Sequence, residues 1–299
     1  MKLAELHWPD VQKLDREKIV AVVPVGSMEQ HGPHLPFQVD VLVSSRLAED
    51  LEKKLPEILL VPPIWTGVSA HHMDFPGSIT LRAKVFMDVL HDICASLHHH
   101  GFRRIVLLNG HGGNRSSLEV LGQELFVELG LTVNTLAYWD LVPDLVKSLK
   151  KTKSSGMGHS GELETSLMLH LAPRLVNQKD IPQGVLGIDE PGPTTGIKRY
   201  VNMKEHSAEG VIGMPSAATP EIGEKLYQGA LDALEKAVRA LQSCLELSAP
   251  PFHFLKSFPY CFSVRVLPVQ IRRSFGNSIV SLLTPRLSSH IGSVERLSI

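Results

Sequence analysis

The chain has 299 residues, of which 43% are hydrophobic and 20% charged, a composition typical of globular enzymes. Its formal net charge of −1 gives no electrostatic reason to bind nucleic acid or an anionic membrane surface. The first residues lack the apolar core of a signal peptide, and no apolar run reaches the ~18 residues of a membrane helix. Three cysteines without CxxC spacing indicate free thiols. We therefore expect a cytoplasmic protein that binds neither nucleic acid nor membranes.

Short apolar runs alternate with amphipathic segments along most of the chain. Strands are predicted at residues 19–25, 58–61, 104–108 and 131–138. Helices are predicted at residues 41–54, 84–100, 116–129, 162–171 and 220–245. This alternation favours an α/β fold with a mainly parallel sheet that is covered on both faces. In such folds ligands bind beyond the carboxyl ends of the strands.

Residues 246–299 differ from the rest of the chain. They contain six basic and two acidic side chains, many serines and little helical periodicity. We interpret them as an extension outside a main domain formed by residues 1–245. The alternative is a small β-subdomain, because the run FSVRVLPVQI could form a strand.

Three potential metal ligands, Glu29, His31 and Asp40, follow the first predicted strand. Carboxylate and imidazole groups are the ligands that zinc, manganese and iron accept in proteins. In an extended segment, positions 29 and 31 project to the same side of the chain. The alternatives are ordinary polar loop residues and, for Asp40, an N-cap of the next helix.

A glycine-rich loop, NGHGGN at residues 109–114, follows the third predicted strand. Its glycines allow the backbone to approach a ligand closely. His111 has no packing role between glycines, which favours a ligand role. The alternative is a loop that binds an anion through its backbone amides.

A third polar cluster, HSGELE at residues 159–164, precedes and opens a predicted helix. A capping box from Ser160 would require Glu or Gln at position 163, which is leucine, so capping does not explain Glu162. The helix dipole alone also favours an acidic residue there. The three-residue gap between His159 and Glu162 lets both reach one centre, where one binds a metal and the other transfers protons.

Together these motifs resemble the signatures of the creatininase family. The similar segments cover roughly residues 5–245 in the family's order and comprise PVGSMEQHGPHLP with Asp40, FPGSITL, NGHGGN, YWDL, HSGELETSLML and GVIGMPSAATPEIGEKL. The resemblance implies a three-layer α/β/α sandwich. It also implies a hydrolase that opens a carbon–nitrogen bond of an amide, cyclic amide or formamide with metal-activated water. The implied cofactors are two divalent metal ions, zinc in the first place, with manganese or iron as alternatives. The implied assembly is a homo-oligomer, a hexamer by analogy, acting on a small-molecule substrate.

The same resemblance assigns roles to individual residues. Asp40 bridges the two ions, Glu29 and His111 complete one site, and His31 and Glu162 complete the other. His159, with Glu162, carries the catalytic acid–base role. Contacts to the substrate are expected from Trp139, His72, Phe75, Glu164, Gly112, Gly113 and Asn114.

Two departures separate this chain from creatininases proper. Gly113 stands where they carry a glutamate, and residues 154–158 lack the tryptophan that they carry before the motif histidine. The substrate is therefore left open. One alternative is a hydrolase, lyase or isomerase of a sugar- or inositol-derived ketone on the same scaffold, and another is a non-catalytic small-molecule binding protein. The acidic ligand set argues against the latter, because buried like charges are costly without a cation.

Overall fold

The computed structural model describes residues 1–152, 156–184 and 200–243, all of which belong to one compact unit. The predicted extension at residues 246–299 lies outside the described residues, as do Cys244 and Cys261. Cys94 is a buried free thiol, as predicted, and its burial raises its pKa to about 12. None of the described helices is long and apolar enough to span a membrane.

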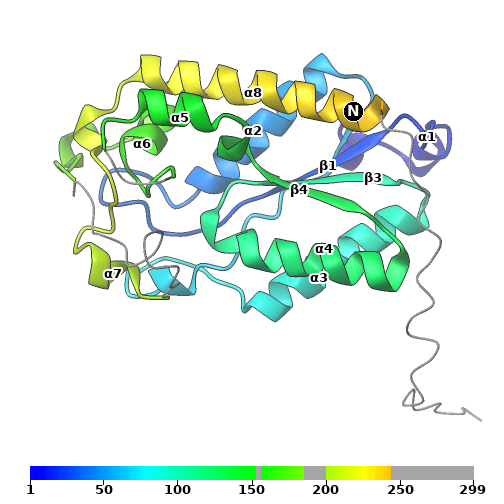
Figure 1. Ribbon diagram of the computed structural model, residues 1–299, viewed down its shortest axis with the longest axis horizontal. Helices are drawn as coiled ribbons and strands as arrows, with labels where there is room; N and C mark the ends of the chain where they lie inside the picture. The colour runs from blue at the N-terminus through cyan, green and yellow to red at the C-terminus, as the bar shows by residue number, and fades with distance from the viewer. Residues whose placement is uncertain (153–155, 185–199, 244–299) are drawn as a thin grey trace, which may run out of the picture. The chain divides into compact units, whose positions relative to one another are not determined.

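A parallel sheet forms the centre of this unit (Figure 1). Its strands are β1 (Val20–Val25), β2 (Ile58–Leu60), β3 (Arg104–Asn109) and β4 (Val133–Ala137), arranged in the order β2-β1-β3-β4. Val20 pairs with Ile58 on one side and with Arg104 on the other, which places β1 inside the sheet. All three pairings are parallel, as the alternation of strands and helices predicts.

Helices cover both faces of the sheet (Figure 1). On one face lie α2 (Val39–Lys54), α5 (Pro143–Leu149), α6 (Glu162–Leu171) and α8 (Pro220–Ser243). On the other face lie α3 (Ala83–His99) and α4 (Arg115–Leu129). Successive β1 side chains alternate between the two cores: Val22 packs in the first and Val23 in the second. This arrangement is the predicted three-layer α/β/α sandwich.

Shorter elements complete the described unit. Two further helices, α1 (Trp8–Gln12) and α7 (Met203–His206), were not predicted from the sequence, and neither was α5. The 3-10 segments are Leu3–Glu5, Ala70–His72, Gly112–Asn114, Tyr138–Leu141, Pro173–Leu175, Gln178–Asp180 and Pro215–Ala217. Asp40 lies in the first turn of α2, so the N-cap alternative for it is wrong.

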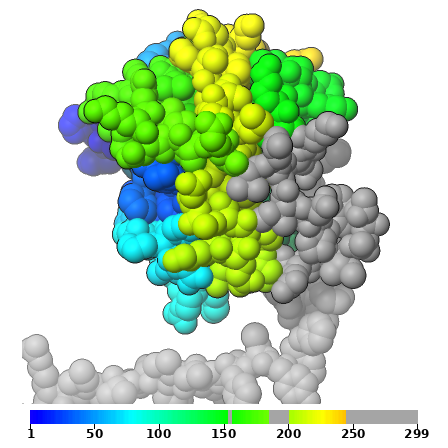
Figure 2. Space-filling model, turned by 90° about the vertical axis from the view of Figure 1, so that its left-hand side faces the viewer, coloured from blue at the N-terminus to red at the C-terminus, as the bar shows by residue number. Residues whose placement is uncertain are grey.

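The loops at the carboxyl ends of the strands are held together by pairing between distant segments. Met28 pairs with Ile79, and His159 pairs with Ile212. Figure 2 looks onto this end of the unit, where the loop after β1 (blue), the segment near residue 75 (cyan) and the segment after residue 200 (yellow-green) adjoin. The sheet and these bridges position the polar cluster described next.

Candidate metal centre

Five buried acidic and histidine side chains gather beyond the carboxyl ends of β1 and β3. They come from four separate segments and are Glu29, His31, Asp40, His111 and Glu164. Glu29 and His31 lie on the loop after β1, Asp40 on α2, His111 after β3 and Glu164 on α6. Four of the five predicted ligands are therefore brought together, and the fifth member is a different glutamate.

The first potential ion site is formed by Glu29, Asp40 and His111, whose ligand atoms all lie within 4.8 Å of one another. Nδ1 of His111 is 3.2 Å from Oε2 of Glu29 and 3.1 Å from Oδ2 of Asp40. Nε2 of His111 lies 3.1 Å from the carbonyl oxygen of Val68, which can only accept a hydrogen bond. Its proton therefore belongs on Nε2, which leaves Nδ1 as the ligand atom.

The second potential ion site is formed by His31, Asp40 and Glu164. Nε2 of His31 lies 3.3 Å from Oδ1 of Asp40 and 3.8 Å from Oε2 of Glu164. Nδ1 of His31 is 3.2 Å from the carbonyl oxygen of Glu29, so it carries the proton and leaves Nε2 for an ion. Asp40 belongs to both groups, with one oxygen directed to each, as a bridging carboxylate would be.

Unsatisfied atoms in this cluster fit a bound cation. Nε2 of His31 and Oδ2 of Asp40 are buried and have no hydrogen-bond partner among the described residues. They face charged neighbours at short range, but not in hydrogen-bond geometry. Three buried carboxylates so close together would repel one another, and divalent ions would neutralise them. The donor set of oxygen and imidazole nitrogen suits zinc, manganese and iron.

Burial and neighbouring charges shift the pKa values of several groups in this cluster. Burial opposes charge on His31, but Asp40 and Glu164 raise its pKa to about 9. Burial also opposes charge on His111, and Glu29 and Asp40 hold its pKa well above the usual value. Burial raises the pKa of Glu164 to about 7, although His31 works against this. Such opposed shifts at one place are typical of functional sites.

His159 lies beside this cluster, where the sequence predicts it. Its Nδ1 is 3.7 Å from Oε1 of Glu29, and its ring centre is 4.4 Å from that of His31. Glu29, His31 and His159 form a third group of potential ligands. Burial and the neighbouring His31 and His72 hold the pKa of His159 well below its usual value.

The expected role of Glu162 does not fit the structure. Its carboxylate belongs to none of the described groups of potential ligands and accepts hydrogen bonds from backbone and hydroxyl groups instead. Oε1 accepts from the N–H groups of Lys151 and Thr152 and from the Thr152 hydroxyl, and Oε2 accepts from the N–H of Met214. Glu162 therefore anchors two loops to α6, and Glu164, expected to contact the substrate, takes its place in the cluster.

The NGHGGN loop holds His111 by close packing. Asn114, expected to contact the substrate, is buried and binds the N–H of Val68, the carbonyl of Gly26 and the side chain of Asn109. A Cβ atom on Gly113 would overlap Nε2 of His111 and the carbonyl of Val68. Gly112, by contrast, faces open space. Asn114 and Gly113 therefore shape the loop, and of these three residues Gly112 alone has room beside it.

The remaining expected substrate contacts lie in different surroundings. Trp139 is half-buried, with the Arg115 guanidinium 5.4 Å from its ring centre. Phe75 is half-buried, with the Lys204 ammonium 5.8 Å from its ring. His72 is buried, with Nε2 at 3.2 Å from Oε1 of Glu29. His72 thus supports a potential ligand and has little surface to offer a substrate.

Two supporting residues escaped the sequence analysis. The hydroxyl of Ser69 donates to Oε2 of Glu29 at 2.6 Å, and Gln30 contacts His72 and His159. Ser69 lies 40 positions from Glu29, and no local pattern marks it. Gln30 stands inside the EQH motif, but alternation directs it away from the side shared by Glu29 and His31.

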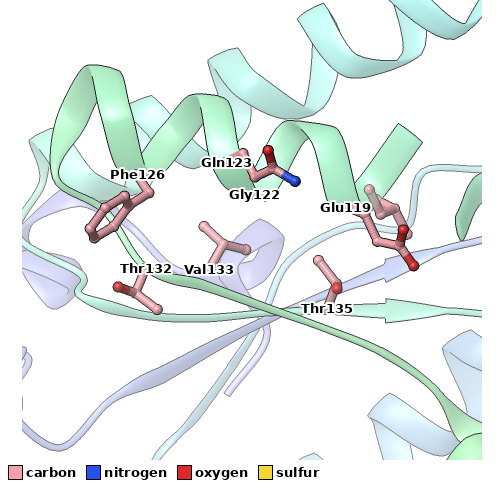
Figure 3. A pocket seen from close by; sticks show the side chains of 8 residues that line it. Glu119, Gly122, Gln123, Phe126, Thr132, Val133 and Thr135 are labelled. Carbon is pink, nitrogen blue, oxygen red and sulfur yellow. The ribbon is translucent and has the colours of Figure 1, made fainter. Parts of the chain in front are cut away.

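A surface groove lies elsewhere, between α4 and β4, and contains none of the cluster residues. Phe126, Thr132 and Val133 are among the side chains that line it (Figure 3). Among the described residues that line it, Glu119 is the only acidic or basic one, and none is a histidine or cysteine. It therefore offers no catalytic group set comparable to the buried cluster.

Comparison with known proteins shows which family the chain belongs to. The family model described as "Creatininase: Creatinine amidohydrolase" matches residues 4–238. The chain belongs to the creatininase family. Creatinine amidohydrolase of Pseudomonas putida is 30% identical over 258 residues, which cover 79% of this chain and 95% of that protein. The 3-dehydro-scyllo-inosose hydrolase of Thermotoga maritima is 29% identical over 272 residues, covering 80% of this chain and 83% of that protein.

Solved creatininase structures share the fold. A mutant creatininase of the Zn-Zn type matches with a TM-score of 0.69 and 27% identity, covering 81% of this chain and 98% of that one. A manganese form of creatininase matches with a TM-score of 0.69 and 27% identity, covering 81% and 99%. Creatininase membership confirms the predicted class, a metal-dependent hydrolase of a carbon–nitrogen bond, ahead of the lyase, isomerase and binding-protein alternatives.

Proposed function

We propose that this creatininase-family protein hydrolyses a small amide, cyclic amide or formamide at a centre of two divalent ions. The observation that carries the proposal is Asp40, a buried carboxylate shared by two groups of potential ligands. Glu29 and His111 complete one group, and His31 and Glu164 complete the other. Glu164 replaces Glu162 in this assignment, because the Glu162 carboxylate is already bound by four donor groups.

Zinc is the proposed metal, with manganese or iron as alternatives. Both oxygen and imidazole donors are present, and no described cysteine lies in the cluster, so the ligand set does not select among these ions. Zinc and manganese occur in the similar creatininase structures, which supports the proposal for this chain.

The proposed mechanism assigns a task to each protein group. Two divalent ions held by these groups would lower the pKa of a bound water and polarise the substrate carbonyl. Asp40, Glu29 and Glu164 hold the centre and keep its charge near balance. His159 directs an unprotonated Nδ1 toward the centre, so it can accept a proton there and pass it to the leaving nitrogen.

The substrate is proposed only by chemical class. Creatinine is not favoured, because this chain has Gly113 where creatininases proper carry a glutamate. A side chain at position 113 would collide with His111 and Val68, so this loop conformation cannot hold that glutamate. A cytoplasmic location and a homo-oligomer, hexameric by family resemblance, belong to the proposal as well. The buried free thiol of Cys94 is compatible with a reducing compartment.

The decisive experiment measures bound metal and activity in the same samples. The full chain is reconstituted with zinc, analysed for metal content and screened against lactams, formamides and cyclic ureides. We expect two ions per chain, about one in Glu164→Gln, and two in the matched control Glu162→Gln. Asp40→Asn should bind no metal, and its activity should be at least ~100-fold lower than that of the unaltered chain.

Opposite behaviour of the two glutamates would refute the ligand assignment. If Glu162→Gln lost an ion and Glu164→Gln kept both, Glu162 would be the ligand. If the unaltered chain bound less than one ion, the hydrolytic centre itself would have to be abandoned.

A further inference from the structure

Gln30 is held so that the direction of its side-chain amide is fixed. It is buried, and Oε1 accepts the N–H of Gly32 at 2.8 Å, while Nε2 donates to the carbonyl of Gly210 at 3.1 Å. An N–H group can only donate and a carbonyl can only accept, so the oxygen and nitrogen of this amide cannot be exchanged. Nε2 therefore has one N–H left to donate.

Two histidine nitrogens compete for that second N–H. Nδ1 of His72 is 2.9 Å from Nε2 of Gln30, and Nε2 of His159 is 3.1 Å from it. However, Nε2 of His159 also lies 2.9 Å from the backbone carbonyl oxygen of Gln30, which can only accept. Nε2 of His159 must carry a proton to make that bond, so it cannot accept another. The second N–H of Gln30 therefore goes to Nδ1 of His72.

This assignment decides the tautomers of both rings. Because Nδ1 of His72 accepts, its proton lies on Nε2, which is 3.2 Å from Oε1 of Glu29 and can donate to it. Because Nε2 of His159 is protonated, its Nδ1 is bare, and it lies 3.7 Å from the same oxygen. The side chain of Gln30 thus makes His72 a hydrogen-bond donor to Glu29, and its backbone carbonyl leaves His159 with a bare nitrogen near the same carboxylate.

We propose that Gln30 is a positioning residue that fixes His72 as a hydrogen-bond donor to Glu29 and keeps Nδ1 of His159 free to bind or accept. The catalytic value of these tautomers rests on the proposed function, but the tautomers can be measured without it. Outer residues of this kind commonly change metal affinity by about 10- to 100-fold when they are altered.

The test is nitrogen NMR of the full chain, labelled with ¹⁵N-histidine, loaded with zinc and recorded at pH 8. Signals are assigned from the variants His72→Gln and His159→Gln. We expect both rings to carry their proton on Nε2. In Gln30→Glu the carboxylate has no hydrogen to donate, so His72 should gain a proton on Nδ1, and zinc affinity should fall about 10- to 100-fold.

Ser69→Ala provides the matched control. It removes the donor to the other oxygen of Glu29, so it should weaken zinc binding and leave both ring tautomers unchanged. A wild-type spectrum with His72 protonated on Nδ1 would overturn the proposal, and so would unchanged tautomers and zinc affinity in Gln30→Glu. If Gln30→Glu failed to fold, the wild-type spectrum and the neutral variant Gln30→Met would still test the proposal. Methionine has no N–H to donate, so His72 should again gain a proton on Nδ1. Correct tautomers without amidase activity would refute the function and spare the role of Gln30.

Discussion

At the scale of single residues, the choice between Glu162 and Glu164 shows what a sequence leaves open. Residues two apart on a helix are about 200° apart around its axis, so only one of the two can face the cluster. Which one faces it depends on how the chain enters α6. Ser160 has a left-handed φ of 54°, its N–H donates to Glu164, and its hydroxyl donates to the carbonyl of His31. That turn selects Glu164, and no spacing rule would have predicted it.

The other ligands could be predicted because each follows a strand or precedes a helix in a motif rich in glycine and proline. Glu29, His31, Asp40 and His111 all reach the cluster. The supporting hydroxyl of Ser69 could not be predicted, since a lone serine in a loop has no distinguishing pattern.

The two glycines after His111 should differ sharply in their tolerance of a methyl group. In Gly113→Ala, the added Cβ would overlap His111 and the Val68 carbonyl. We expect it to cost roughly 1–3 kcal/mol of unfolding free energy and to weaken zinc binding at least about tenfold. Chemical denaturation and zinc titration measure the two effects.

Gly112→Ala is the control, because no described atom outside its own short helical segment and its chain neighbours lies within 4 Å of its Cβ position. Its stability should stay within about 0.5 kcal/mol of the unaltered chain. Equal losses in the two variants would mean that the loop packs differently from the arrangement described above.

At the scale of elements, the sequence predicts the long helices and every strand, with ends displaced by a few residues. Apolar periodicity is strong in α2, α3 and α8, and β1, β2 and β3 are nearly continuous apolar runs, as expected for strands buried on both faces. The edge strand β4 is less apolar, because it contains Asn134 and Thr135 and is only partly buried. The short α1, α5 and α7 offer too few turns for a periodic signal. The order β2-β1-β3-β4 could not be predicted either, because it depends on contacts between distant segments.

Helix α8 packs closely against α6, which carries Glu164, and Gly223 lies at this contact. A Cβ there would overlap the backbone of Ser166. We therefore expect Gly223→Ala to destabilise the protein by roughly 1–3 kcal/mol, even though alanine is the better helix former. Thermal and urea unfolding provide the measurement.

Gly122→Ala in α4 should stabilise the protein, in contrast to Gly223→Ala. Apart from its chain neighbours and the backbone of α4 itself, no described atom lies within 4 Å of its Cβ position, so only helix propensity changes. A gain of about 0.5–1 kcal/mol is expected. A stabilising Gly223→Ala would show that α6 and α8 are not in contact at this point.

At the scale of the whole molecule, the proposed metal centre predicts that stability depends on bound ions. Ions that bind only the folded state stabilise it, by about 4 kcal/mol when the free ion exceeds its dissociation constant roughly 1,000-fold. We expect a chelator to lower the unfolding midpoint of the unaltered chain clearly, and that of Asp40→Asn little, by differential scanning calorimetry. Equal shifts in both would indicate that the ions bind elsewhere.

The division of the chain also leads to a test. The family model ends at residue 238, and the compact unit ends at residue 253. A chain that stops after residue 253 should keep its zinc content, and its unfolding midpoint should change by no more than a few degrees. A chain that stops after residue 215 loses α8, including the buried Leu226 and Leu234, and should not fold. Loss of zinc from the chain that stops after residue 253 would mean that residues 254–299 contribute to metal binding.

The ligands of the cluster are scattered from Glu29 to Glu164. The last of these potential ligands, Glu164, lies on α6, and α6 acquires its packing partner only when α8 has been synthesised. Ions at the proposed centre would therefore be bound only after α8 has been synthesised and has packed on α6.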